Sequence, residues 1–235
     1  MDSKGIGQLF DRISGTYDRF NHLLSLNIDK SWRRKTVARL APADEVLDVA
    51  IGTADLSIEF LKQGKASHIT GLDLSQGMMK IGRAKVEAAG YGSAVDFQEG
   101  SALQMPYPPE SFDTVACAFG VRNFSDPDRG LSEMCRVLKT GGRLAILEFS
   151  YPENPLLKFL YNFFFSWIMP AVGKSVSKDP QAYLYFRESV KNFTWGEKMV
   201  QRIRNAGFSD VSYKTFSCGI CTLYLASKAE SSQQN

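Results

Sequence analysis

Between residues 45 and 150 the chain alternates short apolar segments with longer segments in which apolar residues recur every three or four positions. The first pattern is typical of buried strands and the second of amphipathic helices. Strands that alternate with helices pack most naturally as a parallel sheet with helices on both faces, so we predict a Rossmann-like, doubly wound α/β core. The predicted strands are 45–50, 68–74, 94–100, 112–120 and 143–149, and the predicted helices are 55–63, 77–89 and 127–138.

The segments outside this core have other patterns. The N-terminal segment is predicted to be helical with a break near Ser25, and we interpret it as a lid. A later aromatic-rich segment is predicted to be a helical insertion. The strands 208–216 and 220–227 have a short connection, which predicts an antiparallel pair at a mostly parallel sheet. The predicted organisation is a lid at 1–44, a core at 45–150, an insertion at 151–195, a helix and strand pair at 196–228 and a disordered tail at 229–235.

The composition is that of an ordinary globular protein. The 235 residues are 44% hydrophobic and 23% charged, with a net charge of +3. This charge is too small to indicate nucleic-acid binding, and no basic stripe with aromatic residues is present. No apolar run reaches the roughly 18 residues of a membrane span, and the N-terminus has no signal-peptide core. We therefore expect a cytoplasmic protein.

Cys218 and Cys221 have the CxxC spacing of many metal and redox sites. A zinc site would need two further ligands, and the sequence has neither a second cysteine pair nor clustered histidines. Their segment is predicted to be a strand, in which residues three positions apart point to opposite faces. We interpret them as reduced thiols and predict no metal site.

The segment VLDVAIGTADLS, residues 46–57, joins the first predicted strand to a helix. Such an edge of an open α/β sheet is where ligands bind, and small residues let backbone amides approach a ligand closely. The segment is compatible with a degraded dinucleotide loop, a site for another cofactor, or an ordinary turn. Gly52 alone remains where a dinucleotide loop carries three glycines, and Asp48 and Asp55 would repel a pyrophosphate. Asp55 also suits a plain helix N-cap.

Two further strand ends belong to the same edge. Asp73 ends the second predicted strand, where a carboxylate accepts hydrogen bonds from both ribose hydroxyls. Ser101 and Ala102 follow the third strand, where they would contact an adenine ring. Carboxylates suit a ligand with positive charge, and S-adenosylmethionine carries an ammonium and a sulfonium. The pattern therefore favours this cofactor over a dinucleotide.

Several stretches, in order along the chain, resemble the ubiquinone/menaquinone-biosynthesis C-methyltransferases. The loop 46–57 and GLDLSQGMM at 71–79 are similar to the first two motifs of class I S-adenosylmethionine-dependent methyltransferases. The likeness extends from about residue 9 to about residue 227, although Ala54 stands where the family usually has glycine. The stretches that resemble the narrower family are Tyr17–Ser25 followed by Trp32, Phe119–Asn123 and Arg136–Arg143.

The resemblance implies methylation of demethylmenaquinol, or of a related polyprenyl quinol, with S-adenosylhomocysteine as the second product. One alternative is methylation of another small molecule, such as a ubiquinone precursor, a sterol, a polyketide or a phenol oxygen. A less favoured alternative is a non-catalytic module that binds a cofactor or a partner. The predicted cofactor contacts are Asp48, Gly52, Thr53, Asp73, Leu74, Ser101, Ala102 and Ala118.

Methyl transfer to a ring carbon requires the two reacting carbons in line, and an ionised neighbouring hydroxyl makes the ring carbon nucleophilic. Arg122 follows the fourth strand and would stabilise that phenolate, or else form a structural ion pair. Asn123 would hold a quinol oxygen or cap the turn. Tyr17 would accept a proton, as would His22, or Tyr17 would belong to a packed helix face.

Residues 155–170 are the best candidate for contact with a bilayer, where polyprenyl quinols reside. Lys158, Asn162 and Ser166 form a narrow polar stripe on an otherwise apolar segment that is too short to span a membrane. The segment would lie on the inner membrane face, cover the isoprenoid tail, or pair with a second subunit of a homodimer. It would otherwise pack on the sheet. Trp32 and the basic residues after it would contact anionic lipid or form a solvated helix face.

Overall fold

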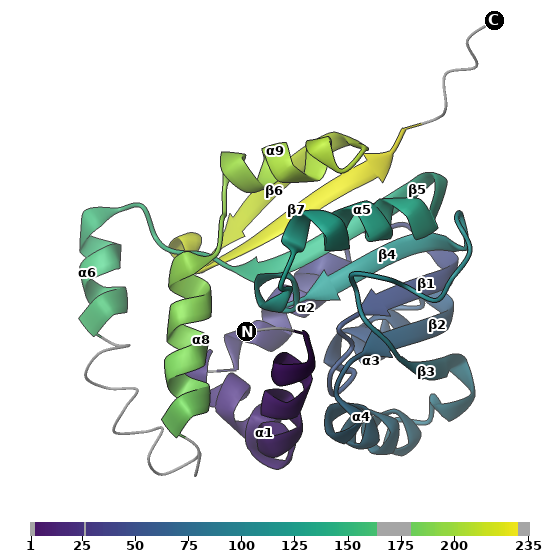
Figure 1. Cartoon of the computed structure of the whole chain (residues 1–235), viewed down its shortest axis with the longest axis horizontal. Helices are drawn as coiled ribbons and strands as arrows, with labels where there is room; N and C mark the ends of the chain where they lie inside the picture. Colours follow the sequence, from purple (N-terminus) through teal and green to yellow (C-terminus); the bar gives the residue numbers. More distant parts are fainter. Residues whose placement is uncertain (1–2, 26, 164–179, 230–235) are drawn as a thin grey trace, which may run out of the picture.

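The computed structural model describes residues 3–25, 27–163 and 180–229. In this part of the chain seven strands form one sheet in the order β3-β2-β1-β4-β5-β7-β6 (Figure 1). Strands β1 to β5 pair in parallel, and β7 is antiparallel to both β5 and β6. The predicted fold class is confirmed. The strands are β1 (Ala43–Val49), β2 (Ala66–Asp73), β3 (Val95–Glu99), β4 (Phe112–Ala118), β5 (Leu138–Phe149), β6 (Phe208–Phe216) and β7 (Cys221–Lys228).

The predicted helices are present, and local chemistry explains several of their ends. Ser75 caps α4 by accepting a hydrogen bond from Met78 N at 3.1 Å, and Asp126 caps α5 by accepting one from Arg129 N at 3.0 Å. Asn27 has a left-handed backbone (φ 60°), which separates α1 from α2. The helices are α1 (Ser3–Leu24), α2 (Ile28–Val37), α3 (Asp55–Lys62), α4 (Gln76–Ala88), α5 (Pro127–Val137), α6 (Pro155–Phe163), α8 (Pro180–Asn192) and α9 (Glu197–Asn205).

The sheet is the middle of three layers, and strand alternation determines which residue enters which layer. Along β5, Leu144 and Ile146 pack in the cluster that contains α5 and α9. Leu147 and Phe149 point to the other face and pack in the cluster that contains residues of α2, α3 and α4. Both faces of the second half of β5 are therefore buried, which explains why residues 144–149 are almost all apolar.

Strand β5 begins at Leu138, five residues before the predicted start at residue 143. The residues between the predicted helix and the predicted strand belong to β5, and Gly141 among them has φ 74°. The pairing with β4 shifts register between Phe112 and Thr114, and this irregularity accommodates the extra residues. A glycine in a left-handed conformation is common at such bulges.

Trp32 is buried (2% exposed), which contradicts both interpretations of this residue as a lipid contact or part of a solvated face. Its Nε1 donates a hydrogen bond to Ser217 Oγ at 2.9 Å, and its ring contacts those of Phe119 and Phe149. Arg33 is also buried (7% exposed) and pairs with Asp29. Trp32 therefore packs α2 against the sheet, where its ring joins those of Phe119 and Phe149 in an aromatic cluster.

The insertion is described in part. Helix α6 covers the first half of the predicted segment 155–170, and residues 164–170 and 230–235 lie outside the described residues. Of the helices that the structure describes, none combines the length and apolar content needed to cross a membrane. In the described chain the cysteines are free thiols, and no three potential ligand side chains gather as a metal site.

Candidate active site

A cavity lies at the carboxyl ends of β1, β2 and β4, where the strand order reverses on either side of β1. This switch point is where open α/β sheets bind ligands. Helix α1 lies between α4 and α8 (Figure 1) and contributes four residues to the wall. The cavity holds about 690 Å³ of empty space, including the space at its mouth. Its wall includes Ile6, Gly7, Phe10, Tyr17, Ala50, Gly52, Leu72, Asp73, Leu74, Met78, Gly100, Ser101, Ala102, Leu103, Ala118, Phe119, Gly120, Asn123 and Phe124.

Asp73 is the acidic residue of this wall. Its Oδ2 accepts a hydrogen bond from Gly52 N at 2.8 Å, and its Oδ1 accepts one from Ser75 N at 2.9 Å. Burial raises the pKa of Asp73, while the hydrogen bonds from Ser75 and Gly52 lower it. A carboxylate offers about four lone-pair sites, so these two bonds fix its orientation and leave room for ribose hydroxyls.

The loop after β1 uses unusual backbone conformations. Gly52 has φ 54°, and Ala50 (φ 57°) and Ala54 (φ 65°) adopt the same left-handed region despite their side chains. Such residues cluster at functional sites, where the surrounding structure maintains them. Ala54 is thus the N-cap of α3, and the carboxylate of Asp55 does not cap this helix. The family that this chain resembles usually has glycine in place of Ala54, and glycine would adopt the left-handed conformation freely.

Asp48 lies outside the cavity wall. It is 1% exposed on β1, and its Oδ2 accepts a hydrogen bond from Ser57 Oγ at 2.6 Å. Burial raises the pKa of Asp48 to about 7. The contact ties the end of β1 to α3, so the structure places Asp48 in support of the loop. Its direct cofactor contact stays a prediction.

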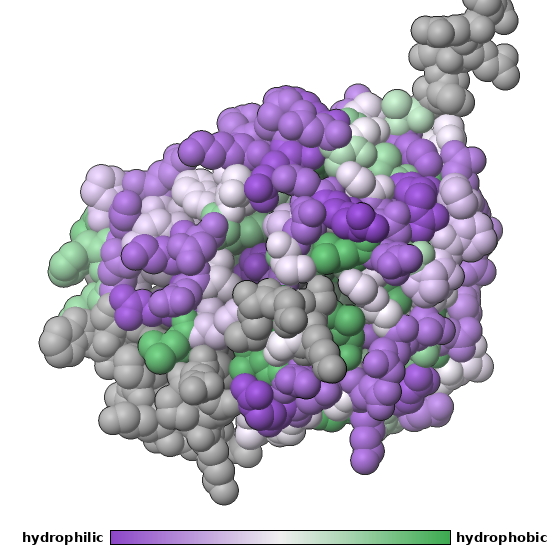
Figure 2. All heavy atoms as spheres, viewed as in Figure 1, coloured by the Kyte–Doolittle hydropathy of each residue, from purple (hydrophilic) through white to green (hydrophobic). Residues whose placement is uncertain are grey.

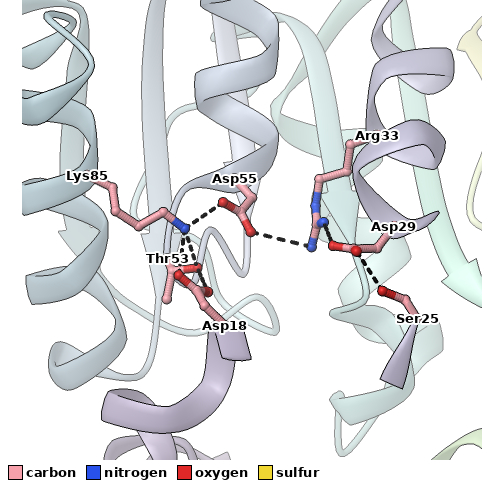
Figure 3. A network of polar contacts seen from close by, with 7 residues as sticks. All are labelled: Asp18, Ser25, Asp29, Arg33, Thr53, Asp55 and Lys85. Carbon is pink, nitrogen blue, oxygen red and sulfur yellow. Dashed lines mark hydrogen bonds and ion pairs between the residues drawn. The ribbon is translucent and has the colours of Figure 1, made fainter. Parts of the chain in front are cut away.

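Thr53 also lies outside the cavity wall, at the centre of a polar network (Figure 3). Its hydroxyl donates to Asp18 Oδ1 at 2.5 Å, and Lys85 Nζ lies 3.2 Å from the same hydroxyl. Lys85 also contacts Asp18 Oδ2 at 2.7 Å and Asp55 Oδ1 at 2.5 Å. These contacts connect α1, α4 and the loop after β1, and we call the group Asp18, Thr53, Asp55 and Lys85 the clasp.

The network continues into α2. Asp55 Oδ2 lies 3.9 Å from Arg33 Nη2, and Arg33 forms a short ion pair with Asp29, which accepts a hydrogen bond from Ser25 Oγ at 2.6 Å (Figure 3). Burial alone would lower the pKa of Arg33, but Asp55 and Asp29 raise it. Positive and negative groups alternate along the chain of contacts, so each buried charge has an opposite neighbour.

Across β1 from β2, the wall of the cavity contains Phe119, Asn123 and Phe124 of the turn after β4. Helix α1 adds the rings of Phe10 and Tyr17 to the same wall. Phe119 has a left-handed backbone (φ 60°) at the end of β4, and the next residue, Gly120, is closely packed. A Cβ at Gly120 would lie 2.6 Å from Cys117 Sγ and 2.7 Å from Ala50 Cβ, so only glycine fits. The turn after β4 is therefore held against the loop after β1.

The side chain of Arg122 is buried and does not line the cavity. Its Nη1 lies 2.8 Å from Glu148 Oε1, and the two side chains are 3% and 0% exposed. The guanidinium also lies over the rings of Phe149 and Phe186. Burial alone would lower the pKa of Arg122, but Glu148 raises it. This placement agrees with the structural alternative for Arg122. The guanidinium Nε has no hydrogen-bond partner among the described residues, and a role toward a phenolate stays a prediction.

The structure thus brings most of the predicted residues together and leaves three behind the wall. Asp48, Thr53 and Arg122 instead contact Ser57, Asp18 and Glu148, respectively. Sequence reasoning missed Phe10, Met78 and the clasp residue Lys85, since their place depends on how α1 and α4 pack on the core. The predicted residues that line the cavity are Tyr17, Gly52, Asp73, Leu74, Ser101, Ala102, Ala118 and Asn123.

Solved structures share the fold. A [4+2]-cyclase, SpnF, matches with a TM-score of 0.73 at 18% identity, covering 98% of each chain. A SAM-dependent methyltransferase from Thermotoga maritima matches with a TM-score of 0.66 at 20% identity, covering 95% of this chain and 99% of that one. The cyclase shows that the fold alone does not determine the reaction.

The strand order, the acidic end of β2 and the loop after β1 fit the predicted class I S-adenosylmethionine-dependent methyltransferase, and the family match shows that the protein is such an enzyme. The model of the ubiE/COQ5 methyltransferase family matches residues 1–228, and the chain belongs to this family. It is 42% identical over 228 residues to the demethylmenaquinone methyltransferase of Bacteroides fragilis, covering 96% of this chain and 93% of that one. It is 39% identical to the ubiquinone/menaquinone biosynthesis C-methyltransferase UbiE of Geotalea daltonii, covering 95% and 96%.

Proposed function

We propose that the protein transfers a methyl group to a ring carbon of demethylmenaquinol in menaquinone biosynthesis. The observation that carries the proposal is a single cavity that extends across β1 and has different residues on its two sides. The end next to β2 and β3 contains Asp73, Ser101 and Ala102, and the end after β4 contains Phe119 and Asn123, with Tyr17 added from α1. The names of the relatives from Bacteroides and Geotalea agree with this activity.

The residues of the first end fit a nucleoside. The oriented carboxylate of Asp73 would hold the ribose hydroxyls, and Leu74, Met78 and Ala102 offer apolar surface for an adenine ring. When bound, S-adenosylmethionine supplies an electrophilic methyl group on a sulfonium. No basic side chain lines the described cavity, in keeping with a ligand that bears positive charge and no phosphate.

At the second end, this chain would bind and activate the acceptor ring. A phenol has a pKa of about 10, so hydrogen-bond donors near its oxygen are needed to favour the phenolate at neutral pH. Asn123 borders the cavity and carries amide N–H groups, while Tyr17 offers a hydroxyl. The rings of Phe10, Phe119 and Phe124 exclude water and hold the flat acceptor in line.

We further propose that the protein meets its lipid-soluble acceptor at the cytoplasmic face of the inner membrane through α6. Leu156, Phe159 and Phe163 are 67%, 65% and 48% exposed, and their spacing places them on one helix face. The polar residues of α6 are also exposed but contact Tyr151: Asn162 Oδ1 accepts a hydrogen bond from Tyr151 Oη at 2.5 Å, and Lys158 Nζ lies over the Tyr151 ring. Figure 2 shows hydrophobic side chains at the edge that α6 occupies in Figure 1.

The activity is tested by incubating the protein with labelled S-adenosylmethionine and reduced quinones. The panel contains demethylmenaquinol, a ubiquinone precursor, a sterol and a simple phenol. We expect label on a ring carbon of demethylmenaquinol, located by mass spectrometry of fragments. Label on an oxygen, or preferred transfer to another acceptor, would support the alternative methyltransferase activity. Cofactor binding without transfer to any acceptor would support a non-catalytic module.

A further inference from the structure

Tyr185 of α8 reaches the aromatic end of the cavity from a distant part of the sequence. Its Oη donates a hydrogen bond to Asn123 Oδ1 at 3.1 Å, across 62 residues. Its ring packs in the small cluster formed by Leu9 and Ile13 with Phe10 and Tyr17 of α1. Tyr185 therefore contacts both the turn after β4 and the helix that covers the cavity.

The hydrogen bonds of Asn123 fix the orientation of its amide. The pKa of Tyr185 is raised, chiefly by burial; Arg122 lowers it and Glu148 raises it further. The phenol therefore stays protonated and acts as a donor. The amide oxygen must then face Tyr185, and Nδ2 donates to Phe119 O at 3.2 Å. With both contacts made, the amide cannot rotate without losing a buried hydrogen bond.

One donor of Asn123 remains for a ligand. An amide nitrogen carries two hydrogens, and among the described residues Nδ2 uses one of them, toward Phe119 O. Asn123 is 9% exposed and borders the cavity. A fixed N–H group in a water-poor site stabilises a developing anionic oxygen more strongly than a mobile one, because it needs no reorganisation.

We propose that Tyr185 is a positioning residue of the acceptor site, which orients Asn123 so that its remaining N–H donates to the ring oxygen beside the methylated carbon. The inference rests on the proposed function and deepens it. The ligand class is a phenol or hydroquinone whose hydroxyl ionises next to the acceptor carbon. Tyr185 also gives the helical insertion a defined part in the reaction, since α8 supplies the group that orients Asn123.

The test is a double-mutant cycle of Tyr185→Phe and Asn123→Ala. Methyl transfer is measured in single turnovers with saturating S-adenosylmethionine and short-tailed demethylmenaquinol. We expect Tyr185→Phe to lower the rate about five- to tenfold, as for loss of one hydrogen bond. The affinity for S-adenosylhomocysteine should stay unchanged. In the Asn123→Ala background the same change should have no further effect, because Tyr185 acts through Asn123.

The matched control is Tyr213→Phe, which removes a phenol hydroxyl from a side chain that is 40% exposed on β6. Its rate should equal that of the wild type. Effects of Tyr185→Phe and Asn123→Ala that multiply in the double variant would overturn the inference, as would an unchanged rate or a loss confined to cofactor affinity. A wild-type protein that methylates no quinol would refute the proposed function, and the inference with it.

Discussion

Asp48 and Asp73 end neighbouring strands, but their surroundings give them different tasks. Asp73 borders the cavity and is oriented by two backbone N–H groups. Asp48 is almost completely buried and is bonded to Ser57. A buried carboxylate is costly in its charged form, which is why burial raises the pKa of Asp48 to about 7. Between the two pKa values, Asp48 of the folded protein therefore keeps a proton that the same residue of the unfolded chain has released.

Asp48 predicts a pH-dependent stability. Its contribution is fully present below about pH 4 and is lost as the pH rises to about 7, because in this window the unfolded chain binds fewer protons. The free energy of unfolding of the wild type should fall by the order of a few kcal/mol between pH 5 and pH 8 because of Asp48, and we expect Asp48→Asn to remove this fall. Urea denaturation at several pH values measures this. The control is Asp44→Asn, an exposed aspartate. Parallel curves for wild type and Asp48→Asn would show that Asp48 does not titrate in this range.

Arg122 and Glu148 form a buried pair whose halves depend on each other. We expect Arg122→Ala to cost about 3–5 kcal/mol of stability, because it leaves the Glu148 charge unpaired in the interior. The double variant Arg122→Met and Glu148→Gln should recover most of this loss. For comparison, Arg202→Ala breaks an exposed contact with Asp128 at 3.4 Å and should cost about 0–1 kcal/mol. If Arg122→Ala unfolds like the wild type but turns over slowly, Arg122 acts on the phenolate.

At the scale of elements, α1 is attached to the core at two points. Near its middle, Asp11 Oδ1 accepts hydrogen bonds from Ser75 Oγ at 2.6 Å and Gly77 N at 2.9 Å, at the start of α4. Further along, Asp18 joins the clasp with Lys85 and Thr53. Because α1 also forms part of the cavity wall, we expect these attachments to affect how tightly the cavity is covered.

The clasp predicts a local change in α1. Asp18→Asn removes the negative charge that Lys85 and Thr53 share, a contact worth about 1 kcal/mol at this exposure. We expect amide hydrogen exchange to rise about fivefold in α1 and to stay unchanged in β1 and β4. The affinity for S-adenosylhomocysteine should fall severalfold. Asp44→Asn serves again as the control. Unchanged exchange in α1 would mean that the Asp11 contacts and the apolar packing of the helix hold it without Asp18.

At the scale of the whole molecule, the exposed face of α6 predicts how the protein reaches a bilayer. Replacing Phe159 and Phe163 by Ser should leave the fold intact, because both side chains are exposed. It should weaken binding to anionic liposomes and raise the KM for long-tailed but not short-tailed quinols. Ile28→Ser, at another exposed apolar side chain, is the control. Normal liposome binding with a change in oligomeric state would instead assign the face to a second copy.

The sequence alone determined the layers and the edge at which the site lies. Apolar runs separated by amphipathic segments specify strands and helices, and parallel strands bring the ends at Asp48, Asp73 and Ser101 to one side. These patterns are local, with periods of two and of about 3.6 residues, so they can be recognised without knowing any contact. The resemblance of the motifs added the cofactor and the acceptor class.

The tertiary structure decided which of those residues face the cavity. Asp48, Thr53 and Arg122 carry suitable chemistry, but packing turned each toward a partner in the protein: Ser57, Asp18 and Glu148 respectively. Tyr185 and Lys85 gained their places through contacts 62 and 67 residues apart. The periodicity of the sequence assigns a residue to an element and to one face of it. The partner of a polar side chain depends instead on how the elements pack, because a buried donor or acceptor must be satisfied wherever the fold places it.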